Sequence, residues 1–402
     1  MQKKMLATGQ DIQMNKLEVT ASINESKRKR SFFRTGTFLC IILITITLFL
    51  REVFIRNSQA TEIYVRNFYP YISYFWRTLN NYLPVSLTET ILVLLIPSIL
   101  FFIGRGIYRL VKSKNRKATF IKQLRISFTV ILLALTYLLT TFFFNFAFAY
   151  HRLDLADNLN YEISGITVEQ LYEVTDWVKN QVNAASEKVG RNTKLEFEPS
   201  LSQNEVMKTA SEQYKTVAEK TENEFLKKYL YRGKVRVKPV LLSKYWSYTG
   251  ITGVFIPFWM ESNINTATTS DEKIFTALHE IAHSYGFARE NEANFMAFYV
   301  GTQLADPDFS YSAWLLTYTY FNNALYSADK ELHAKIYGEL NDLVRIDIDK
   351  RNDFWKKYEG PVQEISEKSN DIYLKTNRQE SGVKSYGEVV DLIVAYYFEK
   401  IN

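Results

Sequence analysis

Two histidines and a glutamate lie within one pentapeptide of this chain, His279-Glu280-Ile281-Ala282-His283. In a helix, residues four apart share a face, so both imidazoles can reach one cation. Zinc binds imidazole nitrogen at about 2.0–2.1 Å and suits such a pair. Glu280 lies beside the first imidazole, where it can take a proton from a metal-activated water instead of binding the metal. The pattern predicts a hydrolytic zinc site, although it also occurs on ordinary amphipathic helices.

The surrounding residues predict the helix that this site requires. Thr269-Ser270-Asp271-Glu272 fits a capping box at its start. Gly286 can end it in a left-handed turn. A core face recurs at helical spacing, formed by Ile274, Leu278, Ile281 and Tyr285. We therefore expect the two histidines to flank a buried stripe, at the edge of a cleft.

An acidic segment, Glu290-Asn291-Glu292-Ala293-Asn294, follows closely. Glu290, Ala293 and Asn294 match the E-x-x-[A/S]-[D/N] signature of the Glu-zinc peptidases. This resemblance implies that Glu290 is the third zinc ligand, with the fourth position open for water. It also implies that Asn294 orients a ligand histidine through a hydrogen bond. Glu292 and Glu261 remain alternative ligands, and acids at a helix start are also favoured by the helix dipole alone.

Two further segments could contribute to such a site. Thr249–Phe258 reads as a short strand ended by proline. Along it, Phe255, Ile256, Pro257 and Phe258 could bind an extended peptide as an added strand, or the segment could be a plain structural edge strand. Tyr386, between Gly382 and Gly387, is a candidate donor to the oxyanion of the reaction.

The first 150 residues contain three apolar runs that predict membrane-spanning helices, at about 35–54, 85–104 and 126–150. Eight Lys and Arg residues against three acids precede the first run, and residues 105–125 hold eight with no acid. Because positively charged connections stay in the cytoplasm, we expect a cytoplasmic N-terminus, residues 1–34, and an extracytoplasmic domain, residues 151–402. The aromatic connection at residues 51–84 suggests a belt at the outer interface.

Charge is divided between the two halves. Residues 1–151 hold 20 basic and 6 acidic residues, whereas residues 152–402 hold 29 basic and 37 acidic residues. The overall charge of +6 therefore reflects membrane orientation, and an anionic domain argues against nucleic-acid binding. The single cysteine, Cys40, lies in the first run, which excludes cysteine–zinc ligation and a thiol nucleophile in the domain.

Helix signals dominate after residue 150. A capping box at Thr167–Gln170 begins one helix, and Ser202–Leu230 reads as another. Lys234–Val240 alternates as a strand, and Lys330–Tyr358 and Gly382–Ile401 read as helical. The order of helices, small sheet and helices predicts an α+β fold with a mostly helical, zincin-like domain after a three-helix transmembrane region.

The chain resembles a group of uncharacterised bacterial membrane proteins that form a domain of unknown function with N-terminal spans and a zincin-like domain. The resemblance rests on Ile256–Asn265, Leu278–Tyr299, Tyr311-Ser312 and Gly382–Gly387. More distantly, Glu290–Asn294 with Ala297 is similar to the Glu segment of the ImmA/IrrE-type peptidases. Only six residues separate His283 from Glu290, so a tight turn at Gly286 must fold the second helix directly back.

These patterns together predict a zinc metallopeptidase anchored in the lipid bilayer and acting on peptides or proteins outside the cytoplasm. His279, His283 and Glu290 would hold one Zn²⁺, and Glu280 would serve as general base and then as acid to the leaving amine. Two alternatives remain open. One is a catalytically silent zincin-fold module that binds or senses, and the other is a metal-dependent hydrolase of a non-peptide envelope component.

Overall fold

The computed structural model describes residues 36–401, except 164, 378, 380 and 382–387. The chain divides into two compact units. One comprises residues 1–52 and 98–140, and the other comprises residues 53–97 and 141–402. The candidate site residues all belong to the second unit.

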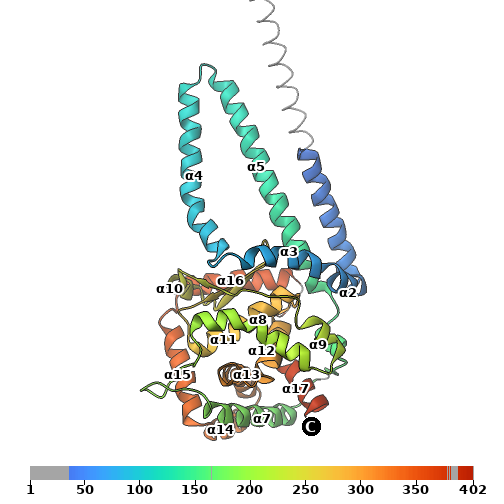
Figure 1. Ribbon diagram of the computed structural model, residues 1–402, viewed down its shortest axis with the longest axis vertical. Coiled ribbons are helices and arrows are strands. Elements are labelled where there is room, and N and C mark those ends of the chain that lie inside the picture. The colour runs from blue at the N-terminus through green and yellow to red at the C-terminus, as the bar shows by residue number, and fades with distance from the viewer. Residues whose placement is uncertain (1–35, 164, 378, 380, 382–387, 402) are drawn as a thin grey trace, which may run out of the picture. The chain divides into compact units, whose positions relative to one another are not determined.

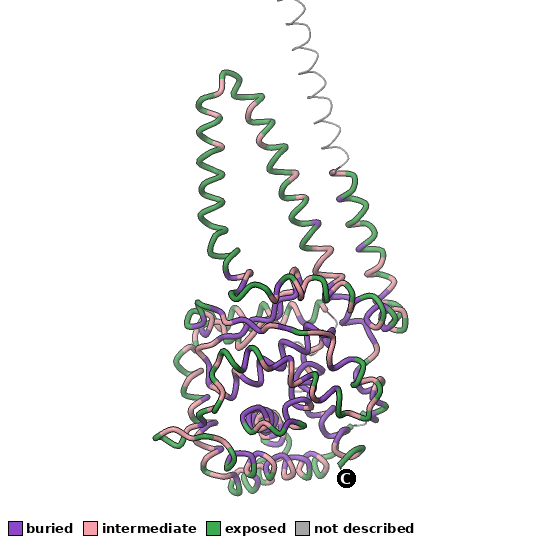
Figure 2. Tube along the Cα trace, in the orientation of Figure 1, coloured by how far each residue is buried: buried purple, intermediate pink, exposed green. Residues whose placement is uncertain are grey.

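Three helices are long and apolar enough to cross a membrane: Gly36–Arg56, α4 (Leu87–Lys112) and α5 (Arg116–Asn145). Much of their surface is exposed along their length, as Figure 2 shows in green. This agrees with the three predicted spans, with changes at the second and the third. Helix α4 ends later than predicted, at Lys112 within the basic connection. Helix α5 starts earlier, within the basic connection, and ends at Asn145, because Ala147–His151 forms a buried 3-10 helix, η1, in the second unit.

The second unit is mostly helical with one small sheet, as predicted (Figure 1). Two short helices precede α4: α2 (Ser58–Asn67) and α3 (Tyr69–Asn81). After η1 come α6 (Leu155–Leu159), α7 (Val168–Ser186), α8 (Gln203–Lys220), α9 (Glu224–Tyr229), β1 (Lys238–Val240), α10 (Ser243–Trp246), the 3-10 turn η2 (Ser247–Thr249), β2 (Gly253–Ile256), β3 (Glu261–Asn265), α11 (Ser270–Tyr285), α12 (Glu290–Thr302), α13 (Pro307–Ala328), α14 (Lys330–Gly338), α15 (Asp342–Lys356), α16 (Pro361–Thr376) and α17 (Val389–Lys400).

Strand β3 is the centre of the three-stranded sheet, with β1 parallel on one side and β2 antiparallel on the other. All five of its residues are buried although four of them are polar. The hydroxyl of Ser262 donates to the carbonyl of Glu280 at 2.9 Å, and the amide of Asn265 donates to the Ser247 hydroxyl at 3.0 Å. The first bond fastens the sheet to α11 and the second fastens it to η2, and each gives a buried polar side chain a partner.

Helix α11 is the core of the unit. It packs against α12, α13, α8, β2 and β3, and nearly every residue of it is buried. Figure 2 shows the same concentration of buried residues at the centre of the unit. Helix α13 packs in turn against α7. A helix buried on all sides can hold side chains in fixed positions, which a chemical site requires.

The start of α11 differs from the prediction. Thr269 is the N-cap residue, but its side chain makes no capping bond, so the predicted capping box is wrong. The Thr269 hydroxyl instead donates to Glu272 at 3.3 Å, and Glu272 accepts from the Trp355 indole at 2.7 Å. The Trp355 indole on α15 therefore binds the Glu272 carboxylate that a capping box would require. The capping box at Thr167 is confirmed, with both of its bonds present.

Three predicted elements are shorter or divided. Ser202–Leu230 is two helices, because Thr221 adopts an extended conformation and Asn223 caps a new helix through the amide of Leu226. Lys330–Tyr358 is likewise divided into α14 and α15. The predicted strand at Lys234–Val240 pairs only from Lys238, since the side chain of Asn81 on α3 binds the carbonyl of Lys234 and the amide of Arg236.

Candidate metal centre

A tight reversal of the chain brings α11 and α12 together. Gly286 follows α11 with a φ of 99°, and the amide of Phe287 donates to the carbonyl of Ala282 at 3.2 Å. A residue with a side chain is strained in this left-handed conformation, so glycine suits the position. Helix α12 then begins at Glu290, as the short spacing required.

His279, His283 and Glu290 converge on one point. The Oε2 atom of Glu290 lies 3.2 Å from Nε2 of His279 and 3.5 Å from Nε2 of His283. One ligand atom from each residue lies within 4.8 Å of the other two, and all three residues are buried. Among the described residues this is the one group of three or more His, Cys, Asp or Glu arranged to hold a metal ion.

The far side of each imidazole is held by an oxygen atom. Nδ1 of His279 lies 2.7 Å from Oδ1 of Asn294, and Nδ1 of His283 lies 2.7 Å from the carbonyl oxygen of Phe287. Because both oxygens are acceptors, each Nδ1 carries the proton and each Nε2 presents a lone pair toward Glu290. Two imidazole lone pairs and a carboxylate oxygen cannot satisfy one another. They fit a shared cation, and this donor set suits zinc.

The electrostatics of the group show the same need for positive charge. Burial lowers the pKa of His283, but the carboxylates of Glu290 and Glu280 outweigh it and raise that pKa to about 9. Burial raises the pKa of Glu290, yet the two histidines bring it down to about 2. Burial lowers the pKa of His279. The carboxylates of Glu290 and Glu280 therefore favour a positive charge beside them, which a bound cation would supply.

Glu280 lies beside this group with a free carboxylate oxygen. Burial raises its pKa to about 8, while His283 lowers it and Glu290 raises it further. Its Oε2 atom is buried and has no hydrogen-bond partner among the described residues. Its Oε1 atom lies against Gly253 of β2, where an added Cβ would approach to 2.6 Å. The absence of a side chain at Gly253 thus makes room for the Glu280 carboxylate.

The two alternative ligands hold other partners. Glu292 accepts from the amide of Leu155 at 2.9 Å and from Arg289 at 2.8 Å. Glu261 forms a fully buried ion pair with Lys238 at 2.9 Å, and it accepts from the first amides of α4, Leu87 and Thr88. Both acids anchor parts of the fold, so Glu290 alone of the three meets the histidines.

The predicted substrate strand is partly formed. Phe255 and Ile256 belong to β2, an edge strand of the sheet that packs beside α11. The ring of Phe255 lies 6.3 Å from that of His283. Pro257 and Phe258 lie beyond the strand, and the Pro257 carbonyl accepts from Asn145, the last residue of α5. An edge strand beside the histidines is compatible with peptide addition and with a structural role alike.

Two residues of the site were missed by the sequence analysis. Phe146 packs its ring at 5.5 Å from that of His283, although it lies in an apolar run read as membrane-spanning. Gln379 accepts from the backbone amide of Glu290 at 3.4 Å, across 89 positions of the chain. Neither position carries a local signal, because only the folded chain brings it to the histidines.

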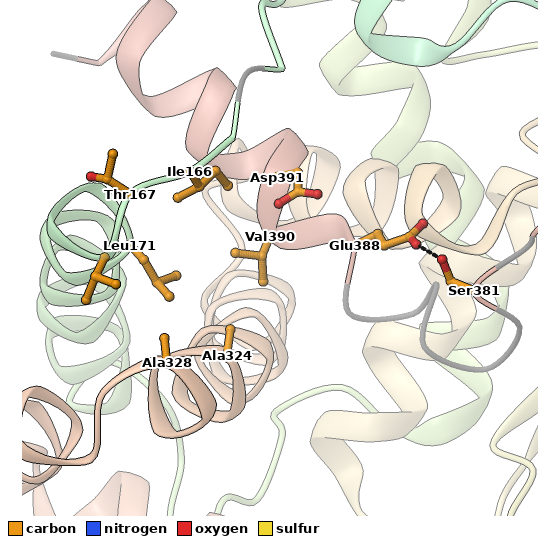
Figure 3. Close-up of a pocket in the computed structure, with 10 residues that line it drawn as sticks. Ile166, Thr167, Leu171, Ala324, Ala328, Ser381, Glu388, Val390 and Asp391 are labelled. Carbon is orange, nitrogen blue, oxygen red and sulfur yellow. Dashed lines mark hydrogen bonds between the residues drawn. The ribbon is translucent and has the colours of Figure 1, made fainter.

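Tyr386, the predicted oxyanion donor, lies outside the described residues. A surface cavity of about 410 Å³ lies between α7, α13 and α17 (Figure 3). Ser381 and Glu388 line it and share a hydrogen bond. None of its lining residues belongs to the histidine–glutamate group, so this cavity is separate from the candidate centre.

Comparison with known proteins places the chain in a family. Residues 64–394 match the model of the family described as Protein of unknown function (DUF3810). The chain belongs to that family. The match includes α11 and α12 with their histidines and glutamate, so the candidate centre lies within the part that defines the DUF3810 domain. No curated protein and no solved structure matches the chain.

Proposed function

We propose that this DUF3810 protein is a membrane-anchored zinc metallopeptidase with a zincin-like domain outside the cytoplasm. The observation that carries the proposal is the convergence of Nε2 of His279, Nε2 of His283 and Oε2 of Glu290, with each Nδ1 already bound to an oxygen acceptor. The orientation with the domain outside rests on the distribution of Lys and Arg around the spans.

His279, His283 and Glu290 would hold the ion. When bound, zinc acts as a Lewis acid that polarises a carbonyl and makes water a stronger acid. Asn294 and the Phe287 carbonyl fix the two rings so that their lone pairs stay directed at the ion. Three protein ligands leave room for substrate and water.

Glu280 supplies the proton transfer. Its unpaired Oε2 atom lies in a buried site where a water can donate to it. Burial raises the pKa of this carboxyl group, which makes its carboxylate a stronger base for accepting a proton from water and returning it to a leaving amine. Phe146 and Phe255 place apolar rings beside His283, where they would limit the access of bulk water to the reacting atoms.

The experiment compares wild type, Glu280→Gln and His283→Ala in a host that expresses the protein. We expect Glu280→Gln to keep its metal and to lose cleavage of envelope proteins, measured by mass spectrometry of new N-termini. His283→Ala should lose both metal and cleavage. A catalytically silent module would give the same fragments in wild type and Glu280→Gln, and that result would refute the peptidase. A hydrolase of a non-peptide component would show Glu280-dependent products that are not peptides.

A further inference from the structure

Helix α3 carries its apolar side outward. Its buried face is largely polar and includes Ser73, Arg77 and Asn80. Its exposed face is a continuous stripe of aromatic and aliphatic side chains. The stripe includes the two cap residues of the helix and consists of Phe68, Tyr71, Tyr74, Phe75, Leu79 and Tyr82. Tyr71 is 79% exposed and Tyr82 is 80% exposed. A helix with this arrangement is typical of the membrane–water interface, where tyrosine and other aromatic residues gather.

Helix α16 has a similar exposed flank. Val362, Ile365 and Ile372 recur on one side of it and are all more than half exposed. The neighbouring flank is charged, with Glu364, Lys368, Asp371 and Lys375. The inner side turns to the protein through the fully buried Leu374. An apolar flank beside a charged flank is the pattern of a helix lying in the plane of an interface.

Both helices lie where the spans join this unit. Helix α4 begins at Leu87, shortly after α3 ends, and the ring of Phe142 in the last turn of α5 lies 6.3 Å from that of Tyr373 on α16. In Figure 1, α3, α10 and α16 lie along one edge of the second unit and α14 lies at the opposite end. Helix α16 packs on η2, next to α10, where Leu241 and Tyr245 are also exposed.

The membrane boundary can be located along α5. Its uncharged part runs from Ile126 to Asn145 and rises roughly 30 Å at about 1.5 Å per residue, which matches the hydrocarbon thickness of a bilayer. The next residue, Phe146, touches the ring of His283. Tyr69 of α3 donates to the carbonyl of Ser284 at 3.0 Å, and Arg77 approaches the same carbonyl at 3.5 Å. The C-terminal turn of α11, which carries His283, is thus bound both by α3 and by the residue after a span.

We infer that α3 and α16 rest in the outer interface of the lipid bilayer and that the His279–His283–Glu290 group lies close to the membrane surface. This inference rests on the proposed function for its substrate class, which is polypeptide attached to the membrane and cleaved close to where it leaves the bilayer. The lipid bilayer is the partner that fits, because α3 leads directly into α4 along the chain and α16 contacts the last turn of α5.

The placement is tested in the full-length protein, in lipid nanodiscs. The native Cys40 is replaced (Cys40→Ala), and single cysteines are introduced as Tyr71→Cys, Ile365→Cys or Ile372→Cys and labelled with bimane. Two matched controls are Lys368→Cys, on the charged flank of α16, and Ala334→Cys, exposed on α14. The readout is quenching by phosphatidylcholine brominated near the headgroup end of its acyl chains.

We expect the brominated lipid to roughly halve the emission at Tyr71, Ile365 and Ile372, to act less at Lys368 and to leave Ala334 unchanged. Quenching at Ile365 no greater than at Ala334 would overturn the placement of α16, and quenching stronger at Lys368 than at Ile365 would overturn its orientation. The quenching measurement requires neither metal nor catalysis, so its result is independent of the test of the proposed function.

The substrate class has its own readout. In the comparison of wild type with Glu280→Gln, we expect the Glu280-dependent cleavage sites to lie next to membrane-spanning segments or lipid anchors of the cleaved proteins. Cleavage confined to proteins without a membrane attachment would overturn this substrate class and leave the peptidase intact. The absence of any Glu280-dependent cleavage would refute the proposed function together with its substrate class, while lipid quenching would still decide the placement.

Discussion

Nδ1 of His279 on α11 lies 2.7 Å from Oδ1 of Asn294 on α12. This bond joins the two helices of the candidate centre and fixes the proton of His279 on the side away from Glu290. Both residues are buried, so water does not compete for the bond. The amide oxygen is neutral, whereas a carboxylate at this position would make the imidazole a stronger base.

Asn294→Ala should weaken metal binding by about 10–100-fold, because His279 loses the acceptor that orients its ring. Asn294→Asp should bind metal at least as tightly as wild type. Competition with a chelator of known affinity measures both. Asn291→Ala, on the same helix, is the control and should leave affinity unchanged. Wild-type affinity in Asn294→Ala would show that this bond does not support the centre.

Gly253→Ala tests the position of the Glu280 carboxylate. The added Cβ would lie 2.6 Å from Oε1 of Glu280 and 2.4 Å from Cγ2 of Thr276. We expect a loss of roughly 1–3 kcal/mol of stability from overpacking, retained metal and at least a tenfold drop in cleavage. Thermal unfolding and metal content are the measurements. Gly338→Ala, where no atom lies within 4 Å, should change nothing. Full activity in Gly253→Ala would contradict the assigned place of Glu280.

Glu272 predicts a pH dependence of stability. Burial and the neighbouring Asp271 raise its pKa to about 7, against the lowering effects of Arg351 and Trp355. The folded protein therefore keeps this proton to higher pH than the unfolded chain does. The free energy of unfolding should fall as pH rises from about 4.5 to about 7.

Glu272→Gln removes this titration and still offers an acceptor to the indole of Trp355. Its melting temperature should exceed that of wild type at pH near 7, and the difference should shrink at lower pH. Glu331→Gln, on the exposed start of α14, is the control. A variant that melts below wild type at neutral pH would show that the charged form of Glu272 stabilises the fold.

Lys238→Met should destabilise the protein strongly without removing metal. The ion pair of Lys238 with Glu261 has no exposed surface, and loss of one partner from such a pair costs roughly 3–5 kcal/mol. Glu261 would remain bound to the first amides of α4. Thermal unfolding and metal content again separate the effects. Loss of metal with unchanged stability would mean that Glu261 belongs to the centre.

The helices of the site could be predicted from the sequence because their signals are local. The apolar stripe from Ile274 to Tyr285 and the glycine at position 286 define α11, and both agree with the structure. The spacing of His279 and His283 and the signature at Glu290 identify the three residues that converge.

Strand β3 could not be predicted, because Glu261, Ser262, Asn263 and Asn265 look like a polar loop. Their burial is stabilised by partners far along the chain, such as Lys238 and the carbonyl of Glu280. Helix α3 was read only as an aromatic belt, since its apolar residues face outward and its polar residues face the core. Helix α16 was missed for a similar reason.

The metal content of the purified full-length protein tests the central claim most directly. Elemental analysis should find one zinc ion per chain in wild type, in Glu280→Gln and in Glu292→Gln, the last being the neighbouring acid that binds Arg289 instead. Glu290→Gln and His283→Ala should contain none. Zinc retained at one per chain in Glu290→Gln, or absent from wild type prepared without chelators, would contradict the account.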